Sequence, residues 1–356
     1  MKEERLKIQA EEVRTCFLCG NFGIPLYSEL QDSLFGTSGN WSFFRCPHCN
    51  LVWLNPRLSL QEIRTHYSTY YNYTQTDMPR GCWVFLKNLA KRSVLAVGFG
   101  YRGKSIKAIE LMIGRFLSWF SPLREIIGGR VMWLKIPEGR KRLLDIGCGT
   151  GGFLAQLRDF GWEVEGVELN PRGVRIAQQN YGLTKVYQGI LKEVCFPNEY
   201  FDVITMSHLI EHLPDPIETL RECFRILKTG GKIVIVTPNI ESLAHKFFGR
   251  HWLGLVPPWH LYVFSRQALK DCILQAGLKI ENIQTLACNA LGIWQLSHLI
   301  KRNNNNNLTK QGGIFYKISD SLSLSSYVSG FMFYILEYFT NKKFSSGEEI
   351  LLVARK

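Results

Sequence analysis

Residues 143–152 read Leu-Leu-Asp-Ile-Gly-Cys-Gly-Thr-Gly-Gly and contain the most informative pattern in the chain. An apolar run enters a glycine-rich turn, and a helical pattern beginning at Phe153 follows directly. Glycines in such a turn let the backbone approach a ligand closely at the positive end of the following helix. The stretch therefore predicts a strand, a ligand-binding loop and a helix, in that order.

A carboxylate follows about twenty residues later, where the next predicted strand ends at Glu168. An acid in this position can accept both hydroxyls of a bound ribose. Residues 147–152 also satisfy the spacing G-x-G-x-x-G, so an NAD-dependent Rossmann oxidoreductase is an alternative. Asp145 favours another ligand, because an acid entering the loop suits a cationic amino acid group better than a pyrophosphate.

Short β-rich runs alternate with amphipathic helical patterns after residue 140, as is typical of an α/β sheet with crossover helices. The runs predicted as strands are Arg142–Ile146, Glu163–Glu168, Lys185–Gln188, Phe201–Ser207, Lys232–Thr237, Leu278–Leu286 and Glu348–Ala354. Asp215 is expected to cap a helix over Ile217–Leu227. The fold predicted from this pattern is a Rossmann-like seven-stranded sheet.

Residues 144–151 resemble the first motif of the class I S-adenosylmethionine-dependent methyltransferases of the domain 23 type, and Glu168 resembles their ribose-binding acid. Further segments resemble, in order, that family's central strand, switch-point helix, fifth strand and antiparallel seventh strand: residues 201–204, 208–216, 227–231 and 347–354. The resemblance covers residues 140–356 and implies methyl transfer from S-adenosylmethionine.

The resemblance also implies a set of cofactor-binding residues: Asp145, Gly147, Cys148, Gly149, Gly151, Glu168, Leu169 and Ser207. The family often places an acid after the third strand to bind the adenine amine, whereas Gly189–Leu191 offers none. Backbone groups and apolar packing from Ile190 and Leu191 are then expected to hold the adenine.

Two C-x-x-C pairs lie near the N-terminus, Cys16 with Cys19 and Cys46 with Cys49. Two thiolates on one tight turn can take adjacent vertices of a tetrahedron, so the pairs predict a closed, structural Zn²⁺ site. Gly20 and Asn50 follow the pairs and tolerate the left-handed backbone that such turns need, and His48 is expected to face solvent or support the site. The alternative is two unrelated pairs of buried or redox cysteines. Other cysteines are expected to pack as small apolar groups: Cys82, Cys148, Cys195 and Cys223.

Histidines supply the candidate bases. His208, Glu211 and His212 follow the fourth strand, at the edge where open α/β sheets bind ligands. His260 lies in a loop that the family uses to cover the acceptor, and it is the preferred base, with His208 second. The alternative for each histidine is a hydrogen-bonded structural role, and Glu211 is expected to accept backbone N–H groups. The pattern H-x-x-E-H also fits an inverted zinc peptidase, but Pro214 interrupts the long helix which that site requires.

The net charge is +13, and residues 80–142 carry fourteen Lys or Arg against three acids. Apolar residues recur at helical spacing among these charges: Ile106, Ile109, Ile113, Phe116, Leu117 and Phe120, with Lys104, Lys107 and Arg115 between them. The pattern suits either an ordinary helix over the sheet or a helix at a membrane surface, and residues 331–339 are a second candidate. The segment contains no recognisable RNA-binding motif, which disfavours a nucleic-acid partner.

The prediction is a zinc ribbon over residues 1–60, a basic helical connector over 61–139 and a methyltransferase domain over 140–356. The acceptor is expected to be a small molecule, a sugar or a lipid-linked compound methylated on O or C, and the zinc ribbon resembles a subgroup associated with surface-polysaccharide biosynthesis. A non-catalytic binding protein is the alternative from another class.

No apolar signal segment or membrane-length apolar run is found, which predicts a cytoplasmic protein with any membrane contact at the surface. Residues Asn303–Asn307 are expected to form a solvated loop.

Overall fold

The computed structural model describes residues 10–35, 37–59, 61–63, 82–102, 106–303 and 324–356. The chain forms two compact units, which are described separately below. The first comprises Met1–Tyr70, Ser207–Arg221 and Ile235–Ala354, and the second comprises Tyr71–Met206, Glu222–Val234 and Arg355–Lys356. Predictions for Arg80, the Cys82 side chain, Lys104 and most of the asparagine run fall outside the described residues.

The seven-stranded sheet has the order β12-β13-β10-β9-β6-β7-β8. Its strands are β6 (Arg142–Ile146), β7 (Glu163–Glu168), β8 (Val186–Gln188), β9 (Phe201–Ser207), β10 (Leu227–Pro238), β12 (Lys279–Leu286) and β13 (Glu349–Arg355). Strand β6 pairs in parallel with β7 and β9, and β7 with β8. The prediction of a Rossmann-like seven-stranded sheet is confirmed.

The last strand, β13, runs antiparallel to its neighbour β10. Asn239 N–H donates to Glu348 O at 2.9 Å, and Lys356 N–H donates to Gly231 O at 3.1 Å, so the residue numbers run in opposite directions. The expected antiparallel insertion of the last strand is therefore confirmed. Strand β10 begins five residues earlier than expected, at Leu227, and the other predicted limits agree within one residue.

The central strands β6 and β9 carry buried apolar side chains, as expected for a parallel sheet that helices cover on both faces. Leu143, Leu144 and Ile204 are fully buried. The helices that follow these strands are α5 (Gly152–Asp159), α6 (Pro171–Tyr181), α7 (Leu191–Val194) and α8 (Pro216–Ile226). The expected cap on α8 is present, since Glu218 N–H donates to Asp215 Oδ1 at 2.8 Å.

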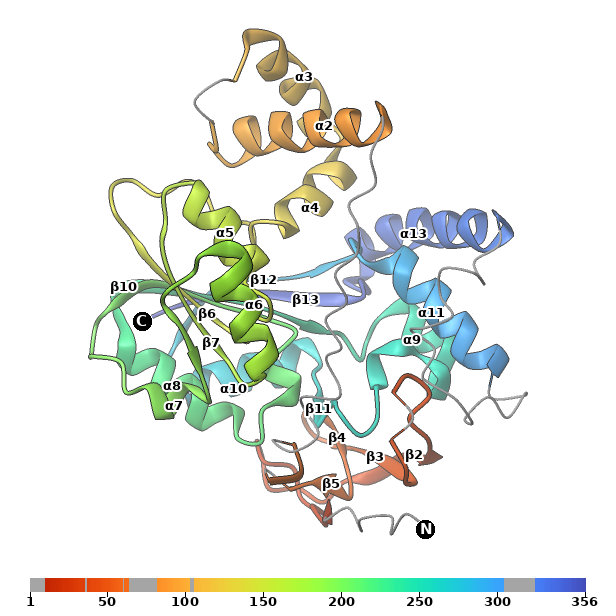
Figure 1. Ribbon diagram of the computed structural model, residues 1–356. Coiled ribbons are helices and arrows are strands. Elements are labelled where there is room, and N and C mark those ends of the chain that lie inside the picture. Colours follow the sequence, from red (N-terminus) through yellow and green to blue (C-terminus); the bar gives the residue numbers. More distant parts are fainter. Residues whose placement is uncertain (1–9, 36, 60, 64–81, 103–105, 304–323) are drawn as a thin grey trace, which may run out of the picture. The chain divides into compact units, whose positions relative to one another are not determined.

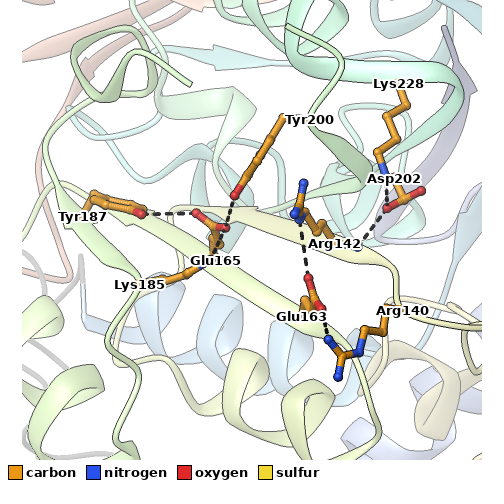
Figure 2. A network of polar contacts seen from close by, with 9 residues as sticks. All are labelled: Arg140, Arg142, Glu163, Glu165, Lys185, Tyr187, Tyr200, Asp202 and Lys228. Carbon is orange, nitrogen blue, oxygen red and sulfur yellow. Dashed lines mark hydrogen bonds and ion pairs between the residues drawn. The ribbon is translucent and has the colours of Figure 1, made fainter. Parts of the chain in front are cut away.

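A polar network lies where these strands begin, at the opposite ends of the strands from the glycine-rich turn (Figure 2). Buried Glu165 accepts hydrogen bonds from Lys185, Tyr187 and Tyr200 at 3.0, 3.2 and 3.1 Å. Asp202 accepts from the backbone N–H of Arg142 at 2.9 Å and from Lys228 Nζ at 2.8 Å. These contacts join the starts of neighbouring strands and so help to fix their register.

The described part of the basic connector includes helices α2 (Cys82–Gly98), α3 (Ala108–Trp119) and α4 (Ser121–Gly129). Helix α3 lies against α2 (Figure 1). The close approach occurs at buried Gly114, where a Cβ atom would collide with the carbonyl oxygen of Ser93. The predicted apolar face of α3 is not buried, because Ile109 is 57% and Phe116 is 74% exposed. This face is therefore not packed against the described residues.

The first unit contains the N-terminal sheet, of order β11-β4-β3-β2. Its strands are β2 (Ile24–Leu30), β3 (Trp41–Arg45), β4 (Val52–Leu54) and β11 (Tyr262–Val263), while β1 (Ala10–Glu11) pairs with β5 (Arg57–Leu58). Strand β11 comes from far along the sequence and pairs antiparallel with β4. A segment outside residues 1–60 therefore completes this sheet.

The remaining elements of the first unit follow β10. They are α9 (Leu243–Phe248), the short 3₁₀ turns η2 (Gly249–His251) and η3 (Leu253–Leu255), α10 (Arg266–Gln275), α11 (Ala290–Asn303) and α13 (Leu324–Phe344). The 3₁₀ turn η1 (Ile210–His212) follows β9. No helix within the described residues is both long and apolar enough to cross a membrane.

Candidate functional site: a cofactor loop and a histidine–carboxylate cluster

The glycine-rich turn has the backbone that its sequence predicts. Gly147, Gly149 and Gly151 have φ values of 75°, 56° and 79°, a region that disfavours side chains. A Cβ atom on Gly151 would also lie 2.6 Å from Leu183 Cδ1. These glycines therefore allow β6 to turn sharply into α5, which begins at Gly152.

Asp145 lies one residue before the end of β6 and is only 6% exposed. The hydroxyl of Thr205, on neighbouring strand β9, donates to its Oδ1 atom at 2.6 Å. Burial raises the pKa of Asp145 to about 7, although the Thr205 hydrogen bond opposes the shift. The ionised carboxylate is therefore costly in the ligand-free protein, and a bound cation would stabilise it.

Glu168 ends β7 and points to the same turn. Its Oε2 atom accepts from Gly149 N–H at 2.8 Å, and its Oε1 atom accepts from Asn170 N–H at 2.7 Å. Burial raises the pKa of Glu168, and these backbone donors oppose that shift. The Nδ2 atom of Asn170 is buried without a hydrogen-bond partner among the described residues, which leaves a polar donor beside the acid.

The other predicted cofactor residues differ in exposure. Cys148 and Leu191 are buried, Leu169 and Ile190 are half-buried, and Ser207 is exposed at the end of β9. The backbone N–H of Ile190 donates to Glu193 Oε2 at 3.0 Å, so an acid lies just beyond the Gly189–Leu191 segment. The second unit contains all the predicted cofactor residues except Ser207, which belongs with His208 and His260 to the first.

His208 follows Ser207 directly and has a positive φ of 51°. Its Nε2 atom lies 2.9 Å from Glu349 Oε1, and its Nδ1 atom lies 3.4 Å from Glu211 Oε1. Burial lowers the pKa of His208, but the two carboxylates outweigh it and raise the pKa to about 10. The imidazole is therefore protonated at neutral pH.

Glu211, His212 and His260 form a buried group beside His208. Glu211 is fully buried, and its Oε2 atom accepts from Thr237 Oγ1 at 2.9 Å. Among the described residues the donor to this carboxylate is a side-chain hydroxyl and not a backbone N–H, which differs from the expectation that Glu211 fixes the loop through backbone donors. Burial raises the pKa of Glu211, but His208 and the two other histidines lower it to about 2.

The two buried histidines contact each other, with ring centroids 4.7 Å apart. His212 Nδ1 lies 2.8 Å from the Trp259 carbonyl oxygen, and His260 Nδ1 lies 2.7 Å from that of Gly254. Burial lowers the pKa of both rings, that of His260 to about 3. Both imidazoles are therefore neutral at pH 7.

Two members of this cluster were not predicted. Glu349 and Thr237 lie in β13 and β10, and nothing in their local sequence marks them as partners of His208 or Glu211. An acid at the start of a strand does not by itself indicate a buried partner for a histidine. Only the pairing of distant strands brings them together.

The four cysteine sulfurs of the N-terminal segment converge within 4.8 Å of one another. Cys16 Sγ is 3.5 Å from Cys49 Sγ, and Cys19 Sγ is 3.4 Å from Cys46 Sγ. Tetrahedral Zn²⁺ with bonds of about 2.3 Å places its sulfurs about 3.8 Å apart, so the cluster fits this ion after a small expansion.

The residues around the cysteine pairs agree with most of the sequence predictions. Gly20 and Asn50 have φ values of 72° and 59°, as expected, and His48 is exposed. Among the other cysteines, Cys148 and Cys223 are buried as expected. Cys195 is exposed, which corrects the prediction that it packs inside; it ends α7 in the left-handed conformation.

A mixed seven-stranded sheet whose antiparallel last strand lies beside β10, with a glycine-rich turn after β6 and an acid at the end of β7, is the architecture of the class I methyltransferases. In agreement, a methyltransferase-domain family model matches residues 123–283. The ubiquinone biosynthesis O-methyltransferase of Pseudomonas fluorescens SBW25 is 30% identical over 187 residues, which cover 49% of this chain and 81% of the relative. Its counterpart in Pseudomonas aeruginosa LESB58 is 31% identical over 188 residues, with the same coverage.

A solved S-adenosylmethionine-dependent methyltransferase from Archaeoglobus fulgidus aligns with 70% of this chain and 100% of that chain, at 22% identity and a TM-score of 0.42. The two Pseudomonas relatives show the family. This chain belongs to the S-adenosylmethionine-dependent methyltransferases and is an enzyme of that class. The oxidoreductase and non-catalytic alternatives are thereby disfavoured.

Proposed function

We propose that the enzyme transfers the methyl group of S-adenosylmethionine to a hydroxyl oxygen of a small-molecule, sugar or lipid-linked acceptor. The main support for this proposal is that His260 is buried and neutral and that its Nδ1–H donates to the Gly254 carbonyl oxygen. The lone pair of the ring is then on Nε2, where it can accept a proton from an acceptor hydroxyl. The names of the curated relatives support oxygen as the methylated atom.

Bound S-adenosylmethionine supplies an electrophilic methyl group on a positively charged sulfur. We assign the ribose hydroxyls to Glu168 and the cationic amino acid end to Asp145, with Gly147, Cys148, Gly149 and Gly151 forming the loop between them. Leu169, Ile190, Leu191 and Ser207 complete the proposed cofactor set. The carboxylates of Asp145 and Glu168 and the spare Asn170 donor suit a cationic, hydroxyl-bearing ligand.

His208 is the weaker candidate for the base. Glu211 and Glu349 keep its ring protonated, and a protonated imidazole donates a proton rather than accepting one. We propose that His208 holds Glu211 in place, while His260 faces the acceptor. Glu211 then stabilises the positive charge that His260 acquires.

The test is methyl transfer from radiolabelled S-adenosylmethionine to two acceptor panels, nucleotide-linked sugars and polyprenyl-substituted phenols. Transfer to the sugars would support the polysaccharide role suggested by the zinc ribbon, and transfer to the phenols would support a role like that of the relatives.

Glu168→Gln should weaken cofactor binding by about 10- to 100-fold, since it removes charge from hydrogen bonds to the ribose. Glu163→Gln, in the same strand β7 but at its other end, is the matched control.

His260→Ala should lower kcat at unchanged cofactor affinity, and His298→Ala, an exposed histidine on α11, should change neither. Cofactor binding without transfer to any acceptor would favour the non-catalytic alternative. Transfer to carbon would contradict the choice of oxygen.

We also propose that Cys16, Cys19, Cys46 and Cys49 bind one structural Zn²⁺ ion. The site is closed by four sulfur ligands, so it is expected to stabilise the N-terminal sheet without taking part in methyl transfer. The convergence of the four sulfurs supports this proposal.

Helix α3 supports a further proposal, peripheral contact with an anionic membrane. It exposes Phe116 and Trp119, the latter 87% exposed, next to exposed Arg115. Aromatic side chains flanked by cations suit the interface of an anionic bilayer. Sedimentation with phosphatidylglycerol vesicles should retain the protein, and Phe116→Ser with Trp119→Ser should release it; equal retention of both forms would contradict the proposal.

A further inference from the structure

Three side chains of the histidine–carboxylate cluster converge in the manner of a metal site. Glu211, His212 and His260 each offer one ligand atom, and these atoms lie within 4.8 Å of one another. All three side chains are buried, with exposures of 0%, 8% and 6%. This group shares no residue with the four cysteines, so it would be a second and chemically different site.

Each histidine is oriented by a hydrogen bond on its other nitrogen. A backbone carbonyl only accepts, so Nδ1 must be the donor to Trp259 O in His212 and to Gly254 O in His260. In the neutral ring the lone pair then resides on Nε2. Metal-binding histidines are commonly held in this way, with the second nitrogen bonded to a carbonyl or carboxylate.

The carboxylate of Glu211 is also held in one orientation. Thr237 Oγ1 donates to Oε2 at 2.9 Å, while buried Oε1 receives no hydrogen bond among the described residues. The nearest polar atom recorded for Oε1 is Nδ1 of His208, at an ion-pair distance of 3.4 Å. Protonated His208 balances the charge of the carboxylate, but buried Oε1 still lacks a hydrogen-bond donor among the described residues, and a metal ion would fill that position.

We propose that Glu211, His212 and His260 bind a divalent transition-metal ion. Two imidazoles and one carboxylate suit Zn²⁺, Fe²⁺ or Mn²⁺ better than Mg²⁺, which prefers oxygen ligands. Ligand bonds of about 2.1 Å would bring the three atoms to about 3.0–3.4 Å from one another, so the site closes slightly on binding.

The site joins two segments of the first unit. Glu211 and His212 belong to η1, whereas His260 lies in the segment between η3 and β11. The backbone already links these segments, because Leu261 N–H donates to Glu211 O at 2.9 Å. The ion would add a second link and fix the position of His260.

The catalytic consequence rests on the proposed function. With the ion in place, Nε2 of His260 would be a ligand and could not accept the proton of the acceptor hydroxyl, so the ion-loaded protein should transfer methyl groups more slowly than the ion-free protein. The presence of the ion itself does not depend on that step.

The experiment compares the metal content of the whole protein with that of Glu211→Gln, after loading with Co²⁺. The amide keeps the shape of Glu211 and the acceptor for Thr237 but is a much poorer ligand. Wild type should hold one more ion per chain than the variant, with ligand-field absorption typical of nitrogen and oxygen ligands. His298→Ala is the control and should match wild type, and circular dichroism checks the folding of every variant.

His212→Asn is a second variant, and it should weaken Co²⁺ binding at this site by at least about 10-fold. Equal metal content in wild type, Glu211→Gln and His212→Asn would overturn the proposal. Methyl transfer measured on the same preparations separates the two hypotheses. An ion bound without methyl transfer in either the ion-loaded or the ion-free protein would leave this site standing and contradict the proposed function, whereas equal transfer in both forms would contradict the catalytic consequence alone.

Discussion

The Nε2 atom of His208 lies 2.9 Å from Oε1 of Glu349, a residue of the last strand. Asn289 Nδ2 donates to the same carboxylate oxygen at 2.6 Å, and Cys288 Sγ lies 3.2 Å from the other oxygen. Because His208 follows β9 and Glu349 begins β13, this ion pair joins two segments that are far apart in the chain. The pair therefore stabilises the tertiary arrangement around Glu211 rather than any single element.

Breaking this pair should cost stability. Glu349→Gln leaves the His208 charge with one carboxylate instead of two. Because the His208 side chain is 41% exposed and partly screened by water, we expect a coupling of about 1–2 kcal/mol rather than the larger values of fully buried pairs. Urea unfolding of His208→Gln, Glu349→Gln and the double variant measures this coupling. Additive effects of the two single changes would show that the pair contributes nothing.

Asp145→Asn should have opposite effects on cofactor binding and on ligand-free stability. Burial raises the pKa of Asp145 from 3.8 to about 7, so the folded protein holds this proton more tightly than the unfolded chain does. Protonated Asp145 therefore contributes to the free energy of unfolding at low pH, and this contribution is lost as the pH rises towards 7. The stability of the variant relative to wild type should therefore rise by about 2–4 kcal/mol between pH 4 and pH 8.

Thermal unfolding across this pH range tests the stability effect, and calorimetric titration with S-adenosylmethionine tests binding. The variant should bind the cofactor much more weakly at pH 8, because the neutral amide does not attract its cationic end. Parallel stability curves for the two proteins would contradict the raised pKa. Unchanged affinity would remove Asp145 from the cofactor site.

Two adjacent glycines of the turn should respond differently to alanine. Gly151 has a φ of 79°, and its Cβ would lie 2.6 Å from Leu183 and 2.8 Å from Ala177, so Gly151→Ala should destabilise by about 2–4 kcal/mol. At Gly152 the nearest atom would be Tyr181 Oη at 3.6 Å, an ordinary contact. Gly152→Ala should be neutral or slightly stabilising, since it begins α5. Similar unfolding midpoints for both variants would be inconsistent with this geometry.

Removing one cysteine ligand should release zinc. Cys46→Ser leaves three thiolates around a site that needs four, so the purified protein should lose its Zn²⁺ and the N-terminal sheet should become sensitive to proteolysis. Exposed Cys195 provides the control, because Cys195→Ser touches no member of the cluster. Metal analysis together with limited proteolysis measures both effects. Less than one zinc per chain in wild type would exclude the site.

The features that the sequence determined by itself are those that depend on short spacing. Gly147, Gly149 and Gly151 are needed because β6 must turn at once into α5, and Glu168 follows one crossover later. Each C-x-x-C pair similarly places two sulfurs on one turn. Such patterns follow from local backbone geometry, so they are visible without knowledge of distant contacts.

The tertiary structure decided what surrounds these local motifs. Glu349 beside His208 keeps that histidine protonated and makes it a poor base, and the Thr237 hydroxyl donates to Glu211 where the sequence predicts backbone N–H groups. Strand β11 joins a sheet formed by residues more than two hundred positions earlier. The physical reason is that the protonation state of a buried group depends on every charge and dipole packed against it, and those neighbours come from strands whose pairing no local pattern specifies.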